Sequence, residues 1–257
     1  MTLKFSPASH RYWLDGKPVT GVTTLIKGGL PAPALTYWAA RSVAEYVADN
    51  EDAVEQLRAM GRGSMVAALK ETPWTARDKA GVRGTDVHAL AEQLVHGVEV
   101  DVPEHLVGHV EACAKFLDVW QPKGLVVEKS VGHRAHWWAG RPDLMAELPD
   151  GRLCCFDWKS SKGIYPETAY QLAAYSHAEF WVEDDEVTEH PLPGPFDLCA
   201  AVHIREDGFD VIPVDGGDET YEHFRHLSFV AQFAKTNRSL VGQPLEAPDY
   251  SQTEGAA

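Results

Sequence analysis

The sequence has no long apolar run and no apolar segment at its N-terminus. No stretch approaches the length of about 18 apolar residues that a membrane-spanning helix needs. The first residues, MTLKFSPASHRYWLDG, lack the basic and then apolar order of a secretory signal peptide. From these two absences we expect a soluble protein that stays in the cytoplasm and does not contact a membrane.

Cysteine is scarce, and its spacing excludes the common metal-binding patterns. None of the four cysteines forms a Cys-x-x-Cys pair. Cys154 and Cys155 are neighbours in a predicted strand, so their side chains point to opposite faces and cannot share a tetrahedral site. We expect buried, reduced thiols rather than a structural zinc site or an iron–sulfur cluster.

Basic residues are few, but the shortage is uneven along the chain. The 23 Lys and Arg residues stand against 38 Asp and Glu residues, a net charge of -15 that argues against a polyanionic partner. Residues 183–222 hold 13 acidic residues and one basic residue, whereas residues 58–83 hold six basic and two acidic residues, and residues 123–162 hold seven and five. Each basic segment can be an ordinary solvated face or a nucleic-acid-binding surface.

The 257 residues, 44% of them hydrophobic, can bury one sizeable core. We expect an N-terminal hairpin and helical elaboration in residues 1–73, packed on a core formed by residues 74–240. The polar tail 241–257 is expected to be disordered.

Helical and strand-like segments alternate along the chain. A hairpin turned at Asp15-Gly16 is expected in residues 10–26, and a second hairpin is expected to turn at Asp207-Gly208. Apolar spacing predicts shorter helices up to residue 73, helices over 33–48, 84–97, 103–122, 166–181 and 218–237, and strands over 125–131, 140–148, 151–159, 196–204 and 209–215. This order predicts an α/β fold in which helices flank a mixed central sheet.

Charged residues interrupt two of the predicted apolar strands. Asp157 and Lys159 fall on one strand face about 7 Å apart, and burying a lone carboxylate there would be costly. An ion pair with Lys159 would satisfy Asp157 but would leave Asp143, on the adjacent strand, unexplained. Two converging carboxylates repel each other unless a divalent cation lies between them. Asp143 and Asp157 therefore predict a Mg²⁺ or Mn²⁺ site, beside which Lys159 could orient or deprotonate a bound water.

The spacing of these residues resembles that of a known enzyme family. Pro-Asp at 142–143, thirteen intervening residues and Asp-x-Lys at 157–159 are similar to the PD-(D/E)xK nucleases. The wider sequence resembles their RecB-like exonuclease branch, including its phage-encoded members. This resemblance implies a restriction-endonuclease-like core and metal-dependent hydrolysis of DNA phosphodiester bonds, which leaves 5′-phosphates and 3′-hydroxyls.

Further matches extend the resemblance through residues 84–182. The segment GTDVHALAE resembles the helix that delivers a metal-binding histidine, which makes His88 the third side-chain ligand. The segment QLAAY matches a Gln-x-x-x-Tyr pattern, so Gln171 and Tyr175 would lie on one helical face and contact phosphate or support Lys159. A packed helical histidine and a plain hydrogen-bonded pair are the competing interpretations.

The resemblance assigns supporting roles to several other residues. It implies that one or two Mg²⁺ or Mn²⁺ ions are bound by the side chains above together with the backbone carbonyl of Trp158. It places Ser160 and Lys162 near the DNA backbone, and Glu128 and Glu92 behind the metal ligands. The cysteine trio that follows these segments in iron–sulfur relatives is missing here, so the cluster is not carried over.

The predicted function is a divalent-metal-dependent exonuclease acting on single- or double-stranded DNA ends. The phage resemblance implies a role in DNA recombination, repair or processing in the host cytoplasm, with a recombination protein as a partner. The alternatives are a structure-specific endonuclease or nickase of the same fold, a non-catalytic DNA-binding protein, and an acidic protein that mimics DNA through residues 183–222. Polarity, strand preference and oligomeric state stay open.

Overall fold

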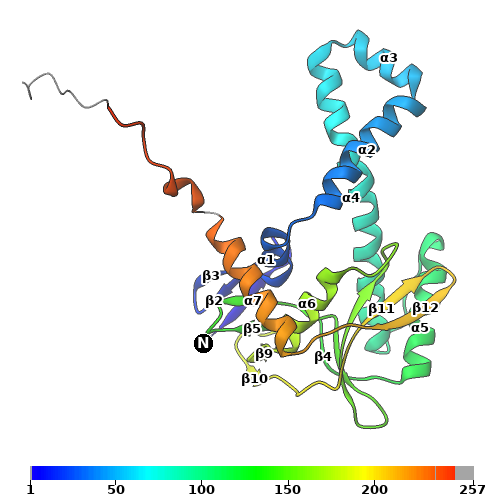
Figure 1. Cartoon of the computed structure of the whole chain (residues 1–257). Helices are drawn as coiled ribbons and strands as arrows, with labels where there is room; N and C mark the ends of the chain where they lie inside the picture. Colours follow the sequence, from blue (N-terminus) through cyan, green and yellow to red (C-terminus); the bar gives the residue numbers. More distant parts are fainter. Residues whose placement is uncertain (1, 235, 247–257) are drawn as a thin grey trace, which may run out of the picture.

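The computed structural model describes residues 2–234 and 236–246, with no account of the side chains of residues 76–83, 238 and 239. Within these residues the chain forms an α/β fold with two mixed β-sheets and surrounding helices (Figure 1). None of the helices in this part of the chain is both long and apolar enough to cross a membrane. Most of the predicted tail, residues 247–257, lies outside the described residues.

The smaller sheet has five strands in the order β12-β11-β8-β7-β4. Strands β8 and β11 are parallel, and the other neighbours are antiparallel. A parallel pair needs a crossover, and helix α6 (Pro166–Ser176) supplies it. The strands are β4 (Lys123–Val127), β7 (Leu144–Glu147), β8 (Leu153–Lys159), β11 (Leu198–Arg205) and β12 (Gly208–Pro213).

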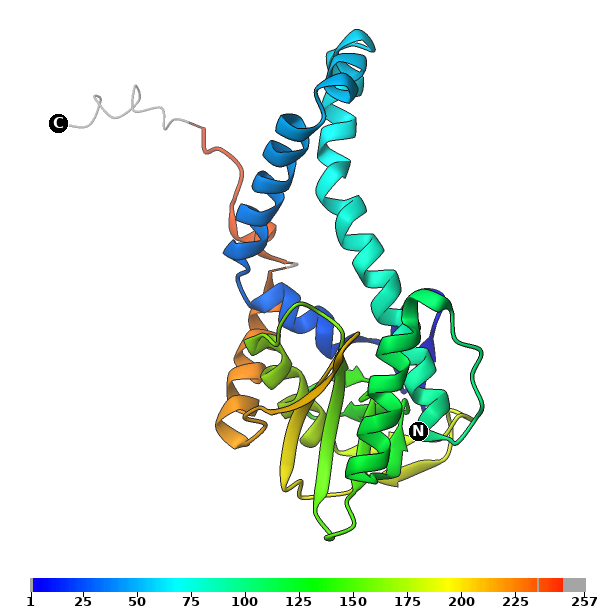
Figure 2. The ribbon, with the colours of Figure 1, turned by 90° about the vertical axis from the view of Figure 1, so that its right-hand side faces the viewer.

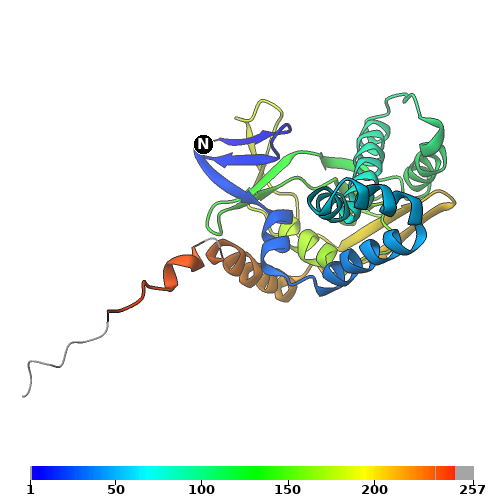
Figure 3. The same ribbon diagram turned by 90° about the horizontal axis from the view of Figure 1, so that it is seen from above.

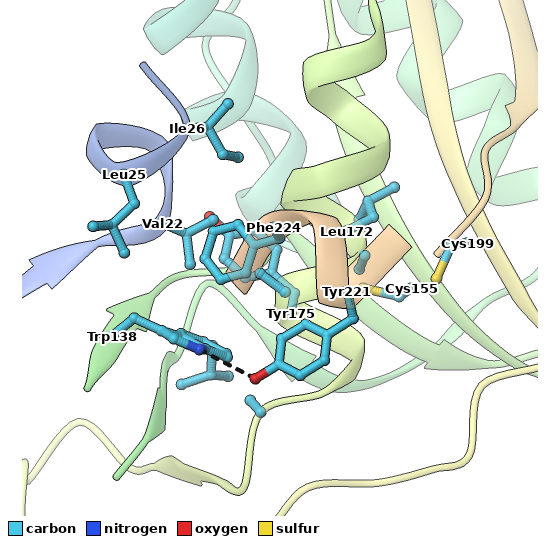
Figure 4. Close-up of a cluster of buried hydrophobic side chains, with 14 of the residues drawn as sticks. Val22, Leu25, Ile26, Trp138, Cys155, Leu172, Tyr175, Cys199, Tyr221 and Phe224 are labelled. Atoms are coloured by element: carbon cyan, nitrogen blue, oxygen red, sulfur yellow. Dashed lines mark hydrogen bonds between the residues drawn. The ribbon is translucent and has the colours of Figure 1, made fainter. Parts of the chain in front are cut away.

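Both faces of the five-stranded sheet are covered. On one face, helix α5 (Val107–Trp120), which follows the short helix η1 (Glu104–Leu106), packs Phe116 edge-on against Phe156 and Trp158 of β8, with ring centroids 5.4 and 5.3 Å apart. On the other face, Cys155 of β8 packs with Leu172 of α6 (Figure 4). Because successive strand residues alternate between faces, the odd-numbered residues of β8 face α6.

The larger sheet has seven short strands in the order β1-β2-β3-β6-β5-β9-β10, and its N-terminal hairpin lies at the opposite end of the molecule from α5 (Figure 3). Strands β3 and β6 are parallel, and all other neighbours are antiparallel. The strands are β1 (Leu3–Ser6), β2 (Arg11–Leu14), β3 (Lys17–Gly21), β5 (Ser130–His133), β6 (Trp138–Gly140), β9 (Phe180–Val182) and β10 (Glu189–Pro191).

A cluster of buried side chains joins the two sheets to the C-terminal helix. Helix α1 (Val22–Gly29) and helix α7 (Asp218–Phe233) pack closely, and a Cβ added at Gly29 would lie 2.1 Å from the carbonyl oxygen of Leu227. Between them, the indole N–H of Trp138 donates to the hydroxyl of Tyr221 at 3.3 Å (Figure 4). The short helix η2 (Asn237–Leu240) follows α7.

Three helices form an arm that projects from the two sheets (Figure 2). They are α2 (Pro33–Asp49), α3 (Glu51–Ala59) and α4 (Arg62–Val95). Helix α2 has no buried residue, so little apolar area fixes it to the rest of the molecule. Helix α4 differs because it runs back from the arm to the five-stranded sheet, where it contacts β4.

Several predicted elements are present, and others differ. The first hairpin turns at Asp15 and Gly16, whose φ angles of 50° and 78° suit a tight hairpin turn. The hairpin was expected to reach residue 26, but its second strand ends at Gly21 and residues 22–26 belong to α1. Predicted separate helices before and after residue 73 are one continuous helix, α4, which contains Pro73. The helix predicted to end at residue 181 ends at Ser176, because the chain then enters β9.

Two predicted strands are each divided between the two sheets. Residues 125–131 were expected as one strand, but β4 and β5 belong to different sheets and the chain turns at Glu128, which has a φ of 48°. Residues 140–148 are divided in the same way, because β6 ends at Gly140 and β7 begins at Leu144. Both breaks lie at the junction of the sheets, where Asp143 is found.

Candidate metal centre

Asp143 and Asp157 lie side by side at the end of the β7–β8 ladder. Leu144 pairs with Phe156, so the next pair in this register joins the two aspartates. The carboxylate of Asp143 accepts a hydrogen bond of 2.6 Å from the backbone N–H of Trp158, which fixes it against β8. Both aspartates are buried, with 7% and 1% of their surface exposed. The register therefore places both aspartates on the face of the sheet that α6 covers, but of the two predicted ligands only Asp143 belongs to the group of close ligand atoms described below.

Asp157 is paired with Lys159. The ammonium group of Lys159 contacts the carboxylate, and apart from this ion pair neither oxygen of Asp157 has a hydrogen-bond partner among the described residues. Burial raises the pKa of Asp157, the charge of Lys159 opposes this, and Asp143 raises it further. Burial also lowers the pKa of Lys159, but Asp157 and Asp143 outweigh burial and raise it above its usual value.

His88 and Glu128 complete a group of metal-binding type around Asp143. Ligand atoms of His88, Glu128 and Asp143 all lie within 4.8 Å of one another, and this is the one such group among the residues that the structure describes. His88 reaches it from α4, with Nδ1 3.3 Å from Oδ1 of Asp143. Imidazole and carboxylate groups in this combination suit Mn²⁺ or Mg²⁺.

The pKa values of His88, Glu128 and Asp143 depend on the charges that neighbouring residues of the site exert on them. Burial lowers the pKa of His88, but the carboxylates of Asp143 and Asp157 more than offset burial and raise it to about 9. Burial and the charge of Asp143 raise the pKa of Glu128 to about 8. Burial alone would raise the pKa of Asp143, but His88 and Lys159 hold it below its usual range. At neutral pH and without a metal, protons therefore occupy two of the three ligands.

Arg141 holds Glu128 in place. Its guanidinium group donates to the backbone carbonyl of Glu128, and its Nε lies 3.5 Å from Oε2 of the same residue. The N–H of Glu128 donates to the carbonyl of Asp143 at 3.2 Å. Arg141 was not among the predicted site residues. Its position directly before Pro142-Asp143 was the only signal, and a lone arginine there has no characteristic spacing.

Gln171 and Tyr175 continue the site along α6. The amide oxygen of Gln171 accepts a hydrogen bond of 3.3 Å from Lys159, and its amide nitrogen donates to the hydroxyl of Tyr175 at 3.3 Å. The two residues share a helical face, as their spacing predicts. Gly140 makes room for this arrangement, because a Cβ there would lie 2.4 Å from Cε1 of Tyr175.

The remaining predicted residues are placed less closely. A Cβ at Gly84 would lie 3.6 Å from the hydroxyl of Ser160, so Ser160 faces α4 near the site. Glu92 is near enough to Glu128 to raise its pKa. Lys162 is exposed. The carbonyl of Trp158 stays a predicted ligand, and the structure assigns to this residue the N–H that binds Asp143.

Taken together, the site offers the three ligand groups of His88, Glu128 and Asp143, the further buried carboxylate of Asp157, and the ammonium group of Lys159, which Gln171 of α6 contacts. Burying several carboxylates together costs free energy of folding unless a cation balances their charge. Clusters of this kind are typical of functional sites. Comparison of the sequence with models of known protein families gave no match, and comparison with curated proteins gave none either.

Proposed function

We propose that this chain is a divalent-metal-dependent deoxyribonuclease of the PD-(D/E)xK type, with a restriction-endonuclease-like core. The observation that supports this most strongly is the group of buried Asp143 and half-buried His88 and Glu128 beside the Asp157–Lys159 ion pair. The five-stranded mixed sheet with α5 on one face and α6 on the other supports an α/β core of this kind, into which β5, β6, β9 and β10 of the second sheet are inserted. We further propose exonuclease action on linear DNA, in phage recombination, repair or processing in the host cytoplasm.

Each part of the site has a role in phosphodiester hydrolysis. When bound, Mg²⁺ or Mn²⁺ would supply a Lewis acid that polarises the scissile phosphate and acidifies water. His88, Glu128, Asp143 and Asp157 would hold it, together with the carbonyl of Trp158. These ligands come from α4, from the β4–β5 turn and from the β7–β8 ladder, so the fold brings them to one point.

Lys159 would orient the attacking water. Its ammonium group is fixed from two sides, by the carboxylate of Asp157 and by the amide oxygen of Gln171. Tyr175 in turn holds the amide of Gln171. Such positioning reduces the entropy that the reaction must lose, and a charge fixed near the developing phosphorane stabilises it. Gln171 and Tyr175 are therefore positioning residues, while Lys159 acts directly on the reactants.

The test compares purified wild-type protein with Asp157→Ala and Lys159→Ala on end-labelled linear DNA in Mg²⁺ and in Mn²⁺. We expect wild-type cleavage with both metals and a loss of at least about 100-fold in each variant. Asp150→Ala is the matched control, because Asp150 lies in the exposed turn of the same hairpin and pairs with Arg152. Cleavage by Asp157→Ala at the wild-type rate would refute the proposal.

Closed circular DNA in the same assay separates the exonuclease from its alternatives. An exonuclease leaves the closed circle intact, whereas an endonuclease or nickase converts it to linear or relaxed DNA. A non-catalytic DNA-binding protein or an acidic DNA mimic cleaves neither substrate with either metal. Cleavage that starts from the labelled ends supports the proposed activity.

A further inference from the structure

Two adjoining cavities lie between the N-terminal hairpin and α1, beside the metal centre. Their volumes are about 290 and about 560 Å³, and both are lined by His10, Tyr12, Gly21 and Thr24. Volumes of this order suit a small ligand or one unit of a polymer. We name the two cavities together the hairpin groove.

The hairpin groove carries no acidic side chain. None of the described residues that line it is Asp or Glu, although the whole chain has 38 such residues. Lys27, His10 and Arg11 line it, as do the hydroxyl groups of Thr23 and Thr24. The first turn of α1 adds backbone N–H groups, since it has no side-chain cap and no acidic residue. This set of donors favours an anionic ligand.

The hairpin groove also presents aromatic faces. Phe5 lines neither cavity but packs against two residues that do, with its ring centroid 4.7 Å from that of Tyr12 and 6.0 Å from that of His10. Tyr12 and His10 line the cavities directly. Aromatic faces beside cationic donors are the combination that binds unpaired nucleotides, because bases stack on the rings while phosphates meet the donors.

Two contacts connect the hairpin groove to the metal centre. Tyr175 and Gly140 line the smaller cavity, and Tyr175 is hydrogen-bonded to Gln171, which holds Lys159. On the other side, the guanidinium carbon of Arg141 lies 5.1 Å from the ring centroid of Phe5. These contacts place the hairpin groove next to the residues that support Lys159 and Glu128, so a strand bound there would lie beside the metal centre.

We propose that the hairpin groove binds one unpaired nucleotide of the substrate strand, next to the phosphate that is cleaved. Its phosphate contacts Lys27, Thr23 and Thr24, and its base stacks against Tyr12 and His10. This inference rests on the proposed nuclease function and adds a strand requirement to it: the end that enters the site is single-stranded or frayed.

The experiment measures binding and cleavage separately with Lys27→Ala and His10→Ala. Both side chains are exposed, so the fold is not at risk. Lys17→Ala is the matched control, because Lys17 is exposed on the same hairpin but lines neither cavity. Binding of a fluorescent single-stranded oligonucleotide is followed by anisotropy in EDTA, where no cleavage occurs.

We expect each groove variant to bind the single strand about tenfold more weakly than wild type, while Lys17→Ala binds almost normally. In cleavage, KM for DNA with an unpaired end should rise with little change in kcat, since the groove holds the strand without touching the reacting atoms. Blunt duplex should be affected less than single strands.

Wild-type binding by both groove variants would overturn the inference, and so would an equal loss in Lys17→Ala or an equal loss for blunt duplex and single strand. These outcomes are distinct from failure of the proposed function. A wild-type protein that cleaves no DNA refutes the nuclease, whereas a cleaving protein whose groove variants behave like wild type refutes only the groove.

Discussion

Asp157 is a single residue whose burial and charge work against the stability of the fold. Its carboxylate is 1% exposed, lies beside a second buried carboxylate, and has one ammonium group as its compensation. Taking charges out of water costs several kcal/mol each, and one ion pair seldom recovers that cost. A core strand built for stability alone would carry an apolar residue here. In the proposed nuclease the charge would be retained because it serves a bound cation and the scissile phosphate.

The protons on His88 and Glu128 lead to a pH prediction. A metal can bind these ligands only after they lose protons, so Mn²⁺ affinity should rise with pH. Glu128 has a pKa of about 8 and His88 a pKa of about 9. Between these two values only His88 is protonated, so metal binding releases one proton and the Mn²⁺ affinity rises about tenfold per pH unit. Below pH 8 two protons are released, and the rise approaches about 100-fold per unit.

Calorimetric Mn²⁺ titrations between pH 6 and 9, in buffers of different ionisation enthalpy, measure both the affinity and the protons released. His88→Ala should bind more weakly and release one proton fewer. His96→Ala is the control, since His96 is an exposed histidine at the end of the same helix. Affinity that does not change between pH 6 and 9 would exclude His88 and Glu128 as ligands.

Some site residues are predictable from the sequence, and others are not. Asp157 and Lys159 stand out because charged residues interrupt a nearly continuous apolar run in a predicted strand. Apolar patterning singles out neither Glu128 nor Arg141; the family resemblance alone indicated Glu128, and it placed Glu128 behind the metal ligands rather than among them. Their roles depend on a left-handed backbone conformation at Glu128, which few non-glycine residues adopt and which apolar patterning does not reveal.

At the scale of elements, the two divided strands explain how the site is formed. Apolar and β-branched residues lie at both ends of 125–131 and fill most of 144–148, so the sequence predicts one strand over 125–131 and one over 140–148. The chain instead leaves the five-stranded sheet and enters the seven-stranded sheet at both places. These exits place Glu128 and Asp143 at the junction of the sheets. Patterning could not show this, because both sheets bury the same kind of residue.

Gly140 gives the sharpest test of this junction. In Gly140→Ala the new Cβ would lie 2.4 Å from the ring of Tyr175, which is buried and cannot move away freely. We expect a loss of about 1–3 kcal/mol in the free energy of unfolding, measured by urea denaturation. Displacing Tyr175 should also release Gln171 and lower the cleavage rate.

Gly163→Ala provides the comparison for that variant. A Cβ at Gly163 meets no atom within 4 Å, so its free energy of unfolding should change by less than about 0.5 kcal/mol. Equal stability of the two variants would mean that β6 does not approach Tyr175 as described. A stable Gly140→Ala protein with full activity would remove Tyr175 from the positioning of Lys159.

At the scale of the whole molecule, the two basic segments differ in how many of their cations are already paired within the chain. In residues 123–162, intramolecular ion pairs already engage most of the cations: Lys129 with Asp184, Arg134 with Glu189, Arg141 with Glu128, Arg152 with Asp150 and Lys159 with Asp157. Two of these partners belong to the acidic stretch 183–222. That stretch therefore neutralises nearby cations within the chain, and the second basic segment offers little free charge to DNA.

The arm presents its basic residues differently. Arg62 and Lys70 are exposed on α4, and neither forms an ion pair with any side chain that the structure describes. At about 1.5 Å of rise per residue, they lie about 39 and about 27 Å along the helix from His88. A duplex leaving the metal centre beside α4 would pass them about 8 to 11 base pairs from the cleaved phosphate.

This geometry predicts a length-dependent effect of the double variant Arg62→Ala with Lys70→Ala. If each residue meets one phosphate, the slope of log affinity against log salt should fall by about 1.8 for a long duplex. A DNA hairpin with a stem of about 6 base pairs should bind the double variant and wild type equally, because its stem ends before the arm. Lys115→Ala with Lys123→Ala, both exposed on the body of the molecule, removes the same charge elsewhere. If both double variants change the slope equally, or if the short stem is affected as much as the long one, the arm does not track the duplex and the effect is one of net charge.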